Sequence, residues 1–173
     1  RMLMDTCIKS ALTLKIVPPP GELFRGNSRI PIRDIEINDL LRREPVRLNS
    51  RSIDALLKGK TVLVTGAGGS IGSEICRQVL RFEPGVLILL GKGENRIFFI
   101  DRELRDRTTS TRLIAKIADV TDVPRMQQIF REYRPDVVFH AAAHKHVPLM
   151  EANVGEAVKN NVCGTRCVAE LSD

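Results

Sequence analysis

A glycine-rich turn between residues 65 and 72 constrains the fold of this chain more than any other feature. It follows a continuous β-branched and apolar run, residues 61–65, which is typical of a strand covered on both faces. Apolar residues at helical spacing come next: Ile71, Ile75, Val79 and Leu80. The pattern therefore predicts a strand, a tight turn and a helix, which together open a βαβ unit.

The glycines of this turn stand where a phosphate could lie against the backbone. Gly66 permits the tight turn, Gly69 allows close approach of a ligand, and Gly72 lets the helix pack near the strand. A helix N-terminus with free N–H groups binds a pyrophosphate well. Ser73 and Glu74 stand where an NTPase would have its P-loop lysine, which argues against that class. The turn predicts dinucleotide binding, with a purely structural loop as the alternative.

Strands and helices alternate along the rest of the chain. Further strands are expected at residues 86–90, 113–117 and 136–139, and helices at 97–104, after the cap at Thr121 or Asp122, and at 155–171. This alternation predicts an α/β fold: a Rossmann-type parallel sheet with helices on both faces, incomplete at the C-terminus. An irregular N-terminal arm, which includes a short helix at residues 52–58, precedes it.

Charge and cysteine content exclude several other classes of protein. Residues 1–58 carry 11 basic and 7 acidic side chains, and the remainder carries 16 and 14, so the chain is no histone-like polycation. The arginines near Pro45 come without an aromatic platform or recognition helix, which argues against nucleic-acid binding. Apolar runs are far shorter than the roughly 20 residues of a membrane helix. The four cysteines form no zinc pattern and suit a reducing, cytoplasmic location.

The tip of the second expected strand bears on the choice of dinucleotide. NAD-preferring proteins usually place a carboxylate there to bind the ribose 2′-hydroxyl. This chain has Gly91 in that place, followed by the cations Lys92 and Arg96. A lysine attracts a 2′-phosphate, so the sequence favours NADP over NAD. Glu94 weakens that preference, and a solvated turn is the alternative role for Lys92.

Two runs, residues 140–153 and 159–165, carry a family resemblance. With the glycine turn, they resemble the bacterial polysaccharide-biosynthesis (CapD-like) nucleotide-sugar epimerase/4,6-dehydratase family of the extended short-chain dehydrogenases. The resemblance runs from about residue 30 onward. It implies an NAD(P)-dependent enzyme acting on a UDP-sugar, typically UDP-N-acetylglucosamine. Longer relatives in the family carry membrane helices.

The resemblance also implies roles for individual residues, for some of which we keep alternatives open. It places Lys92 near the adenosine ribose, Asp119 and Val120 around the adenine, and Lys145 near the sugar. Asp119 ends the third strand, at the carboxyl edge where such sheets bind ligands, but could equally cap a turn. Lys145 could be a solvated loop residue. The remaining implied cofactor contacts are Gly66, Gly69, Ser70, Ile71, Gly72, Ala141, Ala142, Ala143 and Asn161.

No catalytic or metal-binding residue is expected within this chain. Neither Tyr133 nor Met126 nor Met150 is followed four residues later by the lysine that the acid/base motif needs. The three histidines between residues 140 and 146 have no carboxylate or thiolate to complete a metal site. We expect residues 59–173 to be the N-terminal half of an NAD(P)-binding Rossmann domain, residues 31–58 a linker arm with a short helix, and residues 1–30 the tail of a preceding domain.

Two functional hypotheses follow. The first is a cofactor-binding portion of such an enzyme that lacks the acid/base segment and is inactive alone. The second is a non-catalytic dinucleotide-binding regulatory or scaffold module, whose basic arm recruits an anionic partner. The exposed edge of a partial sheet makes a homo-oligomer possible in either case.

Overall fold

The computed structural model describes residues 15–16, 33–34, 50–108 and 110–173. The chain divides into two units, residues 1–48 and 49–173. In the first unit, strand β1 (Lys15–Ile16) pairs antiparallel with β2 (Arg33–Asp34). Residues 1–14, 17–32 and 35–49, which include Arg42, Arg43 and Arg47, lie outside the described residues.

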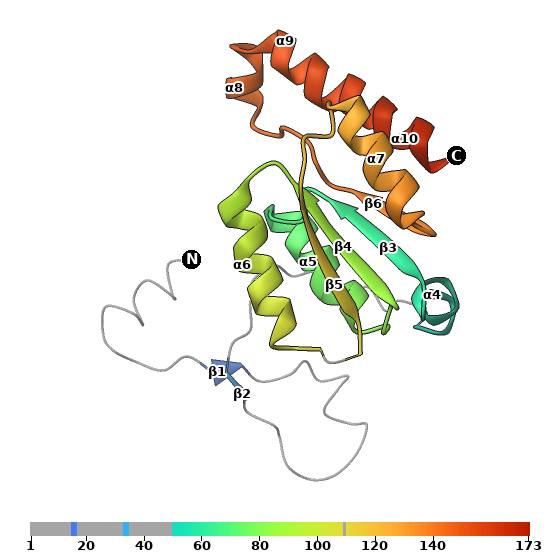
Figure 1. The fold of residues 1–173 in the computed structure, drawn as a ribbon. Coiled ribbons are helices and arrows are strands. Elements are labelled where there is room, and N and C mark those ends of the chain that lie inside the picture. Colours follow the sequence, from blue (N-terminus) through green and yellow to red (C-terminus); the bar gives the residue numbers. More distant parts are fainter. Residues whose placement is uncertain (1–14, 17–32, 35–49, 109) are drawn as a thin grey trace. The chain divides into compact units, whose positions relative to one another are not determined.

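The described part of the second unit is built on one parallel sheet of four strands (Figure 1). The strands are β3 (Thr61–Thr65), β4 (Val86–Gly91), β5 (Arg112–Ile117) and β6 (Val137–His140), in the order β5-β4-β3-β6. Thr61 lies opposite Val86, and Val62 opposite Val137. The expected α/β fold with a Rossmann-type parallel sheet is confirmed.

Helices cover both faces of this sheet because its central strands are apolar on both sides. Val62 and Val64 point to the face covered by α5 (Ser70–Leu80) and α6 (Glu94–Arg105), where they join one buried cluster. Leu63 points to the opposite face, into a second cluster with residues of α7 (Val123–Tyr133) and α10 (Thr165–Ser172). The two clusters hold the sheet between two helical layers.

Helix α4 (Ser50–Leu57) belongs to the second unit instead of the arm in which we expected it. Leu57 is 2% exposed and lies in the cluster under α5 and α6, and Ile53 packs against the same cluster. This burial is the reason that the compact unit begins at residue 49, ten residues before the expected boundary at residue 59.

The expected helix over residues 155–171 is divided into three segments. They are α9 (Val154–Ala157), the π-helix η1 (Val158–Gly164) and α10, with the short helix α8 (Val147–Glu151) before them. Strand β5 also differs from the expected alternation: Leu113 is buried, but Ile117 is 45% exposed because β5 lies at a sheet edge. No helix in the described residues is long and apolar enough to cross a membrane.

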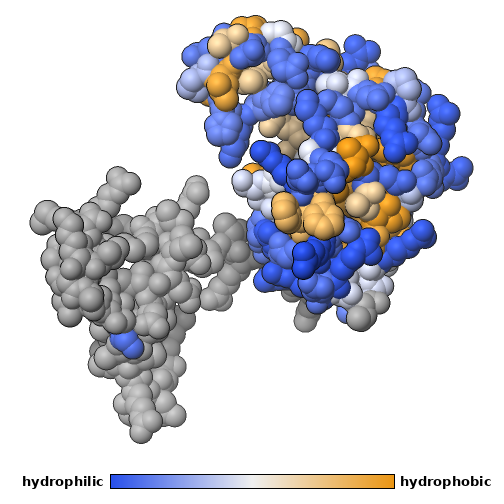
Figure 2. Space-filling model, turned by 60° about the vertical axis from the view of Figure 1, so that its left-hand side comes forward, coloured by the Kyte–Doolittle hydropathy of each residue, from blue (hydrophilic) through white to orange (hydrophobic). Residues whose placement is uncertain are grey.

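Apolar side chains are also exposed outside the core. Figure 2 shows hydrophobic surface, in orange and tan, between hydrophilic areas of the second unit. Phe98 and Phe99 of α6 form an edge-to-face pair at 5.7 Å and are 54% and 66% exposed. Further exposed apolar residues are Leu56, Ile71, Val123, Val147, Leu149, Val154, Val158 and Val162.

Candidate functional site

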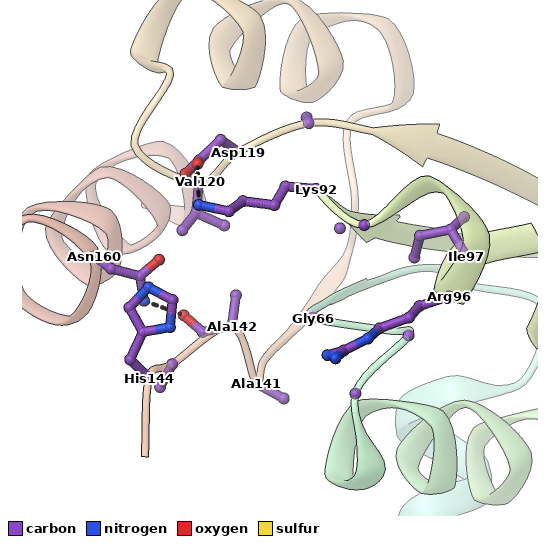
Figure 3. Close-up of a pocket in the computed structure, with 16 residues that line it drawn as sticks. Gly66, Lys92, Arg96, Ile97, Asp119, Val120, Ala141, Ala142, His144 and Asn160 are labelled. Atoms are coloured by element: carbon purple, nitrogen blue, oxygen red, sulfur yellow. Dashed lines mark hydrogen bonds and ion pairs between the residues drawn. The ribbon is translucent and has the colours of Figure 1, made fainter. Parts of the chain in front are cut away.

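A cleft of about 460 Å³ lies at the carboxyl ends of the strands (Figure 3). Segments that follow all four strands of the sheet contribute to it, and so does the π-helix η1. Ligands bind at this edge in open α/β sheets. The residues that line the cleft are Gly66, Gly68, Gly69, Gly91, Lys92, Gly93, Arg96, Ile97, Ala118, Asp119, Val120, Ala141, Ala142, Ala143, His144 and Asn160.

The glycine turn at one side of the cleft has no room for side chains at two positions. Gly66 has a φ of +65°, and a Cβ atom there would lie 2.5 Å from the carbonyl oxygen of Ala141. A Cβ atom on Gly72 would lie 2.1 Å from the carbonyl oxygen of Gly66. Helix α5 therefore packs directly on the turn, with Gly69 as its N-cap. The first N–H groups of such a helix have no partner within the helix and can bind an anion.

Lys92 and Asp119 form an ion pair between the ends of β4 and β5. The Lys92 Nζ lies 3.1 Å from the Asp119 Oδ2, and the two side chains are 57% and 31% exposed. Burial alone would raise the pKa of Asp119, but hydrogen bonds from the backbone N–H and hydroxyl of Thr121 and from Lys92 lower that pKa below its ordinary 3.8. Asp119 is therefore ionised at neutral pH.

Arg96 is the second cation of the cleft. Its side chain extends from the first turn of α6 toward the glycine turn (Figure 3). Within residues 50–108 and 110–173 the guanidinium has no carboxylate partner. A Cβ atom on Gly68 would lie 2.6 Å from the Cβ of Arg96, so the glycine turn packs directly against this residue.

The π-helix positions two successive asparagines against the loop after β6. The Asn161 side chain accepts from the N–H of His144 at 2.8 Å and donates to its carbonyl at 2.9 Å. Asn160 is 6% exposed, and its amide donates to the carbonyl of Ala142 and to the Asn161 Oδ1. Asn161 thus holds the loop at His144 without lining the cleft, while Asn160 lines it. π-Helical turns are frequent at functional sites.

A chain of hydrogen bonds connects the base of this loop to the sheet. The N–H of Ala141 donates to the Thr65 hydroxyl, and the His140 Nδ1 lies 2.7 Å from that hydroxyl. The His140 Nε2 lies 3.0 Å from the Thr165 hydroxyl, which itself donates to the carbonyl of Asn161. Burial lowers the pKa of His140 below its ordinary 6.5, so the ring is neutral at neutral pH. Since the single Thr165 proton is used there, the Nε2 of the neutral ring donates and its Nδ1 accepts from Thr65. His140 is thus a neutral structural residue.

The cleft brings together eight of the residues singled out from the sequence. These are Gly66, Gly69, Lys92, Asp119, Val120, Ala141, Ala142 and Ala143. Five others do not line it. Ser70, Ile71 and Gly72 form the first turn of α5, Asn161 is hydrogen-bonded to His144, and Lys145 is exposed between β6 and α8. Gly91 and Arg96, which the sequence analysis named for the choice of dinucleotide, also line the cleft. The lining residues that the sequence analysis missed are Gly68, Gly93, Ile97, Ala118, His144 and Asn160.

Comparison with known proteins identifies the family. The family described as "Polysaccharide biosynthesis protein" matches residues 62–173. The chain belongs to this family. Over 175 residues it is 50% identical to the probable polysaccharide biosynthesis protein EpsC of Bacillus subtilis, covering 100% of this chain and 29% of that protein. It is 52% identical over 152 residues to the capsular polysaccharide biosynthesis protein CapD of Staphylococcus aureus, covering 87% and 24%.

Two more distantly similar proteins are named as enzymes that act on UDP-sugars. The UDP-N-acetylglucosamine 4,6-dehydratase (inverting) of Campylobacter jejuni is 33% identical over 116 residues, covering 66% of this chain and 33% of that enzyme. A solved UDP-glucose-4-epimerase from Stenotrophomonas maltophila, with bound NAD and formylated UDP-arabinopyranose, matches with a TM-score of 0.55 and 27% identity, covering 65% and 33%. The chain spans about a third or less of the length of each of these relatives.

Proposed function

We propose that this chain is the NAD(P)-binding portion of a nucleotide-sugar 4,6-dehydratase or epimerase of polysaccharide biosynthesis, with a UDP-N-acetylglucosamine-type substrate. The observation that carries the proposal is the cleft. A turn with no space for a Cβ atom at Gly66 or Gly72 opens α5, and small residues continue along the floor at Ala141 and Ala142. These features fit a dinucleotide, whose pyrophosphate needs bare backbone at a helix N-terminus. The relatedness to UDP-sugar enzymes supports the substrate class.

Different residues of the cleft would contact different parts of a bound dinucleotide. Gly66, Gly69 and the first turn of α5 would hold the pyrophosphate. Lys92, Asp119 and Val120 would surround the adenosine, and Ala141 to Ala143 would border the path toward the nicotinamide. When bound, the nicotinamide supplies hydride transfer. Lys145 would approach the sugar from the loop before α8.

NADP is the dinucleotide that the cleft suits better. The end of β4 carries Gly91 instead of a carboxylate, and two cations that follow it, Lys92 and Arg96, line the cleft. A 2′-phosphate adds negative charge at that place, which cations attract. Both the cofactor and the free thiols of Cys76, Cys163 and Cys167 suit a cytoplasmic location.

The described residues hold no acid/base pair of the short-chain dehydrogenase type at the cleft. Tyr133 packs its ring at 4.7 Å from the Lys116 Nζ, outside the cleft lining. Proton transfer from the sugar hydroxyl needs a group positioned beside it. We therefore expect this chain to bind a dinucleotide without turning over a nucleotide sugar.

Calorimetric titration of the 173-residue chain with NADPH and with NADH tests the proposal. We expect saturable binding of both, with NADPH tighter. In the same preparation, UDP-N-acetylglucosamine incubated with NADP should remain unchanged by mass spectrometry. If the chain bound neither dinucleotide, the proposed function would be wrong. A 4-keto or dehydrated product would contradict the expected inactivity of this chain.

A further inference from the structure

The two cations of the cleft differ in what holds them. Arg96 has no carboxylate partner within the described residues of the second unit, whereas the Lys92 ammonium lies 3.1 Å from Asp119. In Figure 3 the Lys92 side chain runs from the end of β4 toward Asp119 beyond β5, and the Arg96 side chain runs toward the glycine turn. An anionic ligand in the cleft would therefore find Arg96 available and Lys92 already paired with Asp119.

The two partners of this ion pair also differ in freedom. The Asp119 Oδ1 accepts from the N–H of Thr121 at 3.0 Å and from its hydroxyl at 2.9 Å, so the carboxylate is fixed at the start of its own turn. Its Oδ2 faces Lys92. Lys92 is 57% exposed and has a flexible four-carbon stem, so its ammonium can leave Asp119 without rearrangement of the backbone. The lysine can exchange partners, and the carboxylate cannot.

We propose that Asp119 weakens the preference of this cleft for NADP by competing with the ribose 2′-phosphate for Lys92. The inference rests on the proposed function. A ligand with a 2′-phosphate must draw the ammonium away from Asp119, whereas a ligand with a 2′-hydroxyl leaves the pair in place. Asp119 thereby reduces an NADP preference that Lys92 and Arg96 would otherwise make stronger. Glu94, exposed in the first turn of α6, adds a second carboxylate next to the lining residue Gly93.

Four proteins test this competition: the wild type, Asp119→Asn, Lys92→Met and the double variant. The quantity measured is the ratio of the NADH to the NADPH dissociation constant at low ionic strength. Asparagine keeps the acceptor for Thr121 and removes the charge, and methionine keeps most of the lysine stem. Asp119→Asn should raise the ratio about threefold, the size expected when an exposed ion pair no longer competes. Lys92→Met should lower it.

The double variant distinguishes competition from direct repulsion. If Asp119 acts through Lys92, the substitution to asparagine changes the ratio little once Lys92 is methionine. An equal rise in both backgrounds would show that Asp119 repels the phosphate directly and would overturn the proposal. An unchanged or lower ratio in Asp119→Asn alone would overturn it as well. General weakening of the adenosine site affects both ligands and cancels in the ratio.

A second lysine–aspartate pair provides the matched control. Lys60 and Asp136 lie 3.8 Å apart before β3 and β6, at the opposite end of the strands from the cleft. Asp136→Asn should leave the ratio unchanged, and a rise equal to that of Asp119→Asn would overturn the proposal. If the wild-type chain binds neither dinucleotide, the proposed function fails. If it binds both and only the ratios fail to move, this inference alone is wrong.

Discussion

Burial and hydrogen bonding both favour the neutral form of the His140 ring. Burial lowers its pKa below the ordinary 6.5, and both ring nitrogens have hydroxyl partners, Thr65 and Thr165, that are satisfied with a neutral ring. Protonation would place an N–H against the Thr65 hydroxyl, whose own proton would then lose the Nδ1 acceptor. The neutral ring therefore helps to hold β6 against β3, and with β6 the loop that lines the cleft.

This predicts a fall in stability on mild acidification. Since the folded chain binds the proton less well than the unfolded one, the free energy of unfolding decreases as the pH falls below 6.5, by at most about 1.4 kcal/mol per pH unit. The decrease ends below the pKa of the folded state. His140→Asn keeps an acceptor and should make the profile flatter between pH 6.5 and 5. Urea denaturation over this range measures it, with exposed His146→Asn as control. An equally steep profile in His140→Asn would contradict the prediction.

At the scale of elements, local pattern was sufficient where one segment determines its own structure. The β3–turn–α5 unit was predicted because apolar period, glycine spacing and helix start all agree within residues 61–80. The π-helix was not, since residues 155–171 have ordinary helical spacing. Its side-chain partners are distant in sequence: Asn160 and Asn161 bond to the Ala142–His144 loop, some 17 residues away.

The contact between α5 and its turn gives a prediction at this scale. Gly72→Ala introduces a Cβ atom that meets the Gly66 carbonyl oxygen at 2.1 Å. The helix must move away from the turn, at a cost of about 1–3 kcal/mol, typical of overpacking. We expect lower stability in urea and loss of dinucleotide binding by calorimetry. Gly155→Ala is the matched control, because its Cβ atom would meet nothing within 4 Å. Retained binding in Gly72→Ala would show that the turn tolerates displacement.

At the scale of the whole molecule, the sequence predicted which residues lie at the ends of the strands. It did not predict which side chains from distant segments contact one another. Parallel strands place their carboxyl ends together, so Lys92, Asp119 and Ala141 could be assigned to one edge before any coordinates. The ion pair between Lys92 and Asp119 could not, since it joins side chains 27 residues apart. Likewise, the start of the compact unit at residue 49 depends on the burial of Leu57 under distant helices.

The cysteines report on this whole-molecule packing. Cys76 of α5 is fully buried in the cluster that this helix forms with the sheet, and burial raises the pKa of its thiol to about 12. Cys167 is 5% exposed, and burial raises the pKa of its thiol as well. Cys163, on the π-helix, is exposed. Cys7 lies outside the described residues. Alkylation followed by mass spectrometry should therefore modify Cys163 of the native chain about a thousandfold faster than Cys76, whose reaction requires unfolding.

The same measurement connects the cleft to the core. A dinucleotide that binds only the folded chain lowers the unfolded population by mass action, so saturating NADPH should slow the alkylation of Cys76 further. It should leave the rate at Cys163 nearly unchanged, because that thiol reacts without unfolding. Comparable rates at Cys76 and Cys163 in the absence of ligand would mean that the four-stranded sheet and its helices open freely in solution. The two helical layers described above would then fail to form a stable unit by themselves.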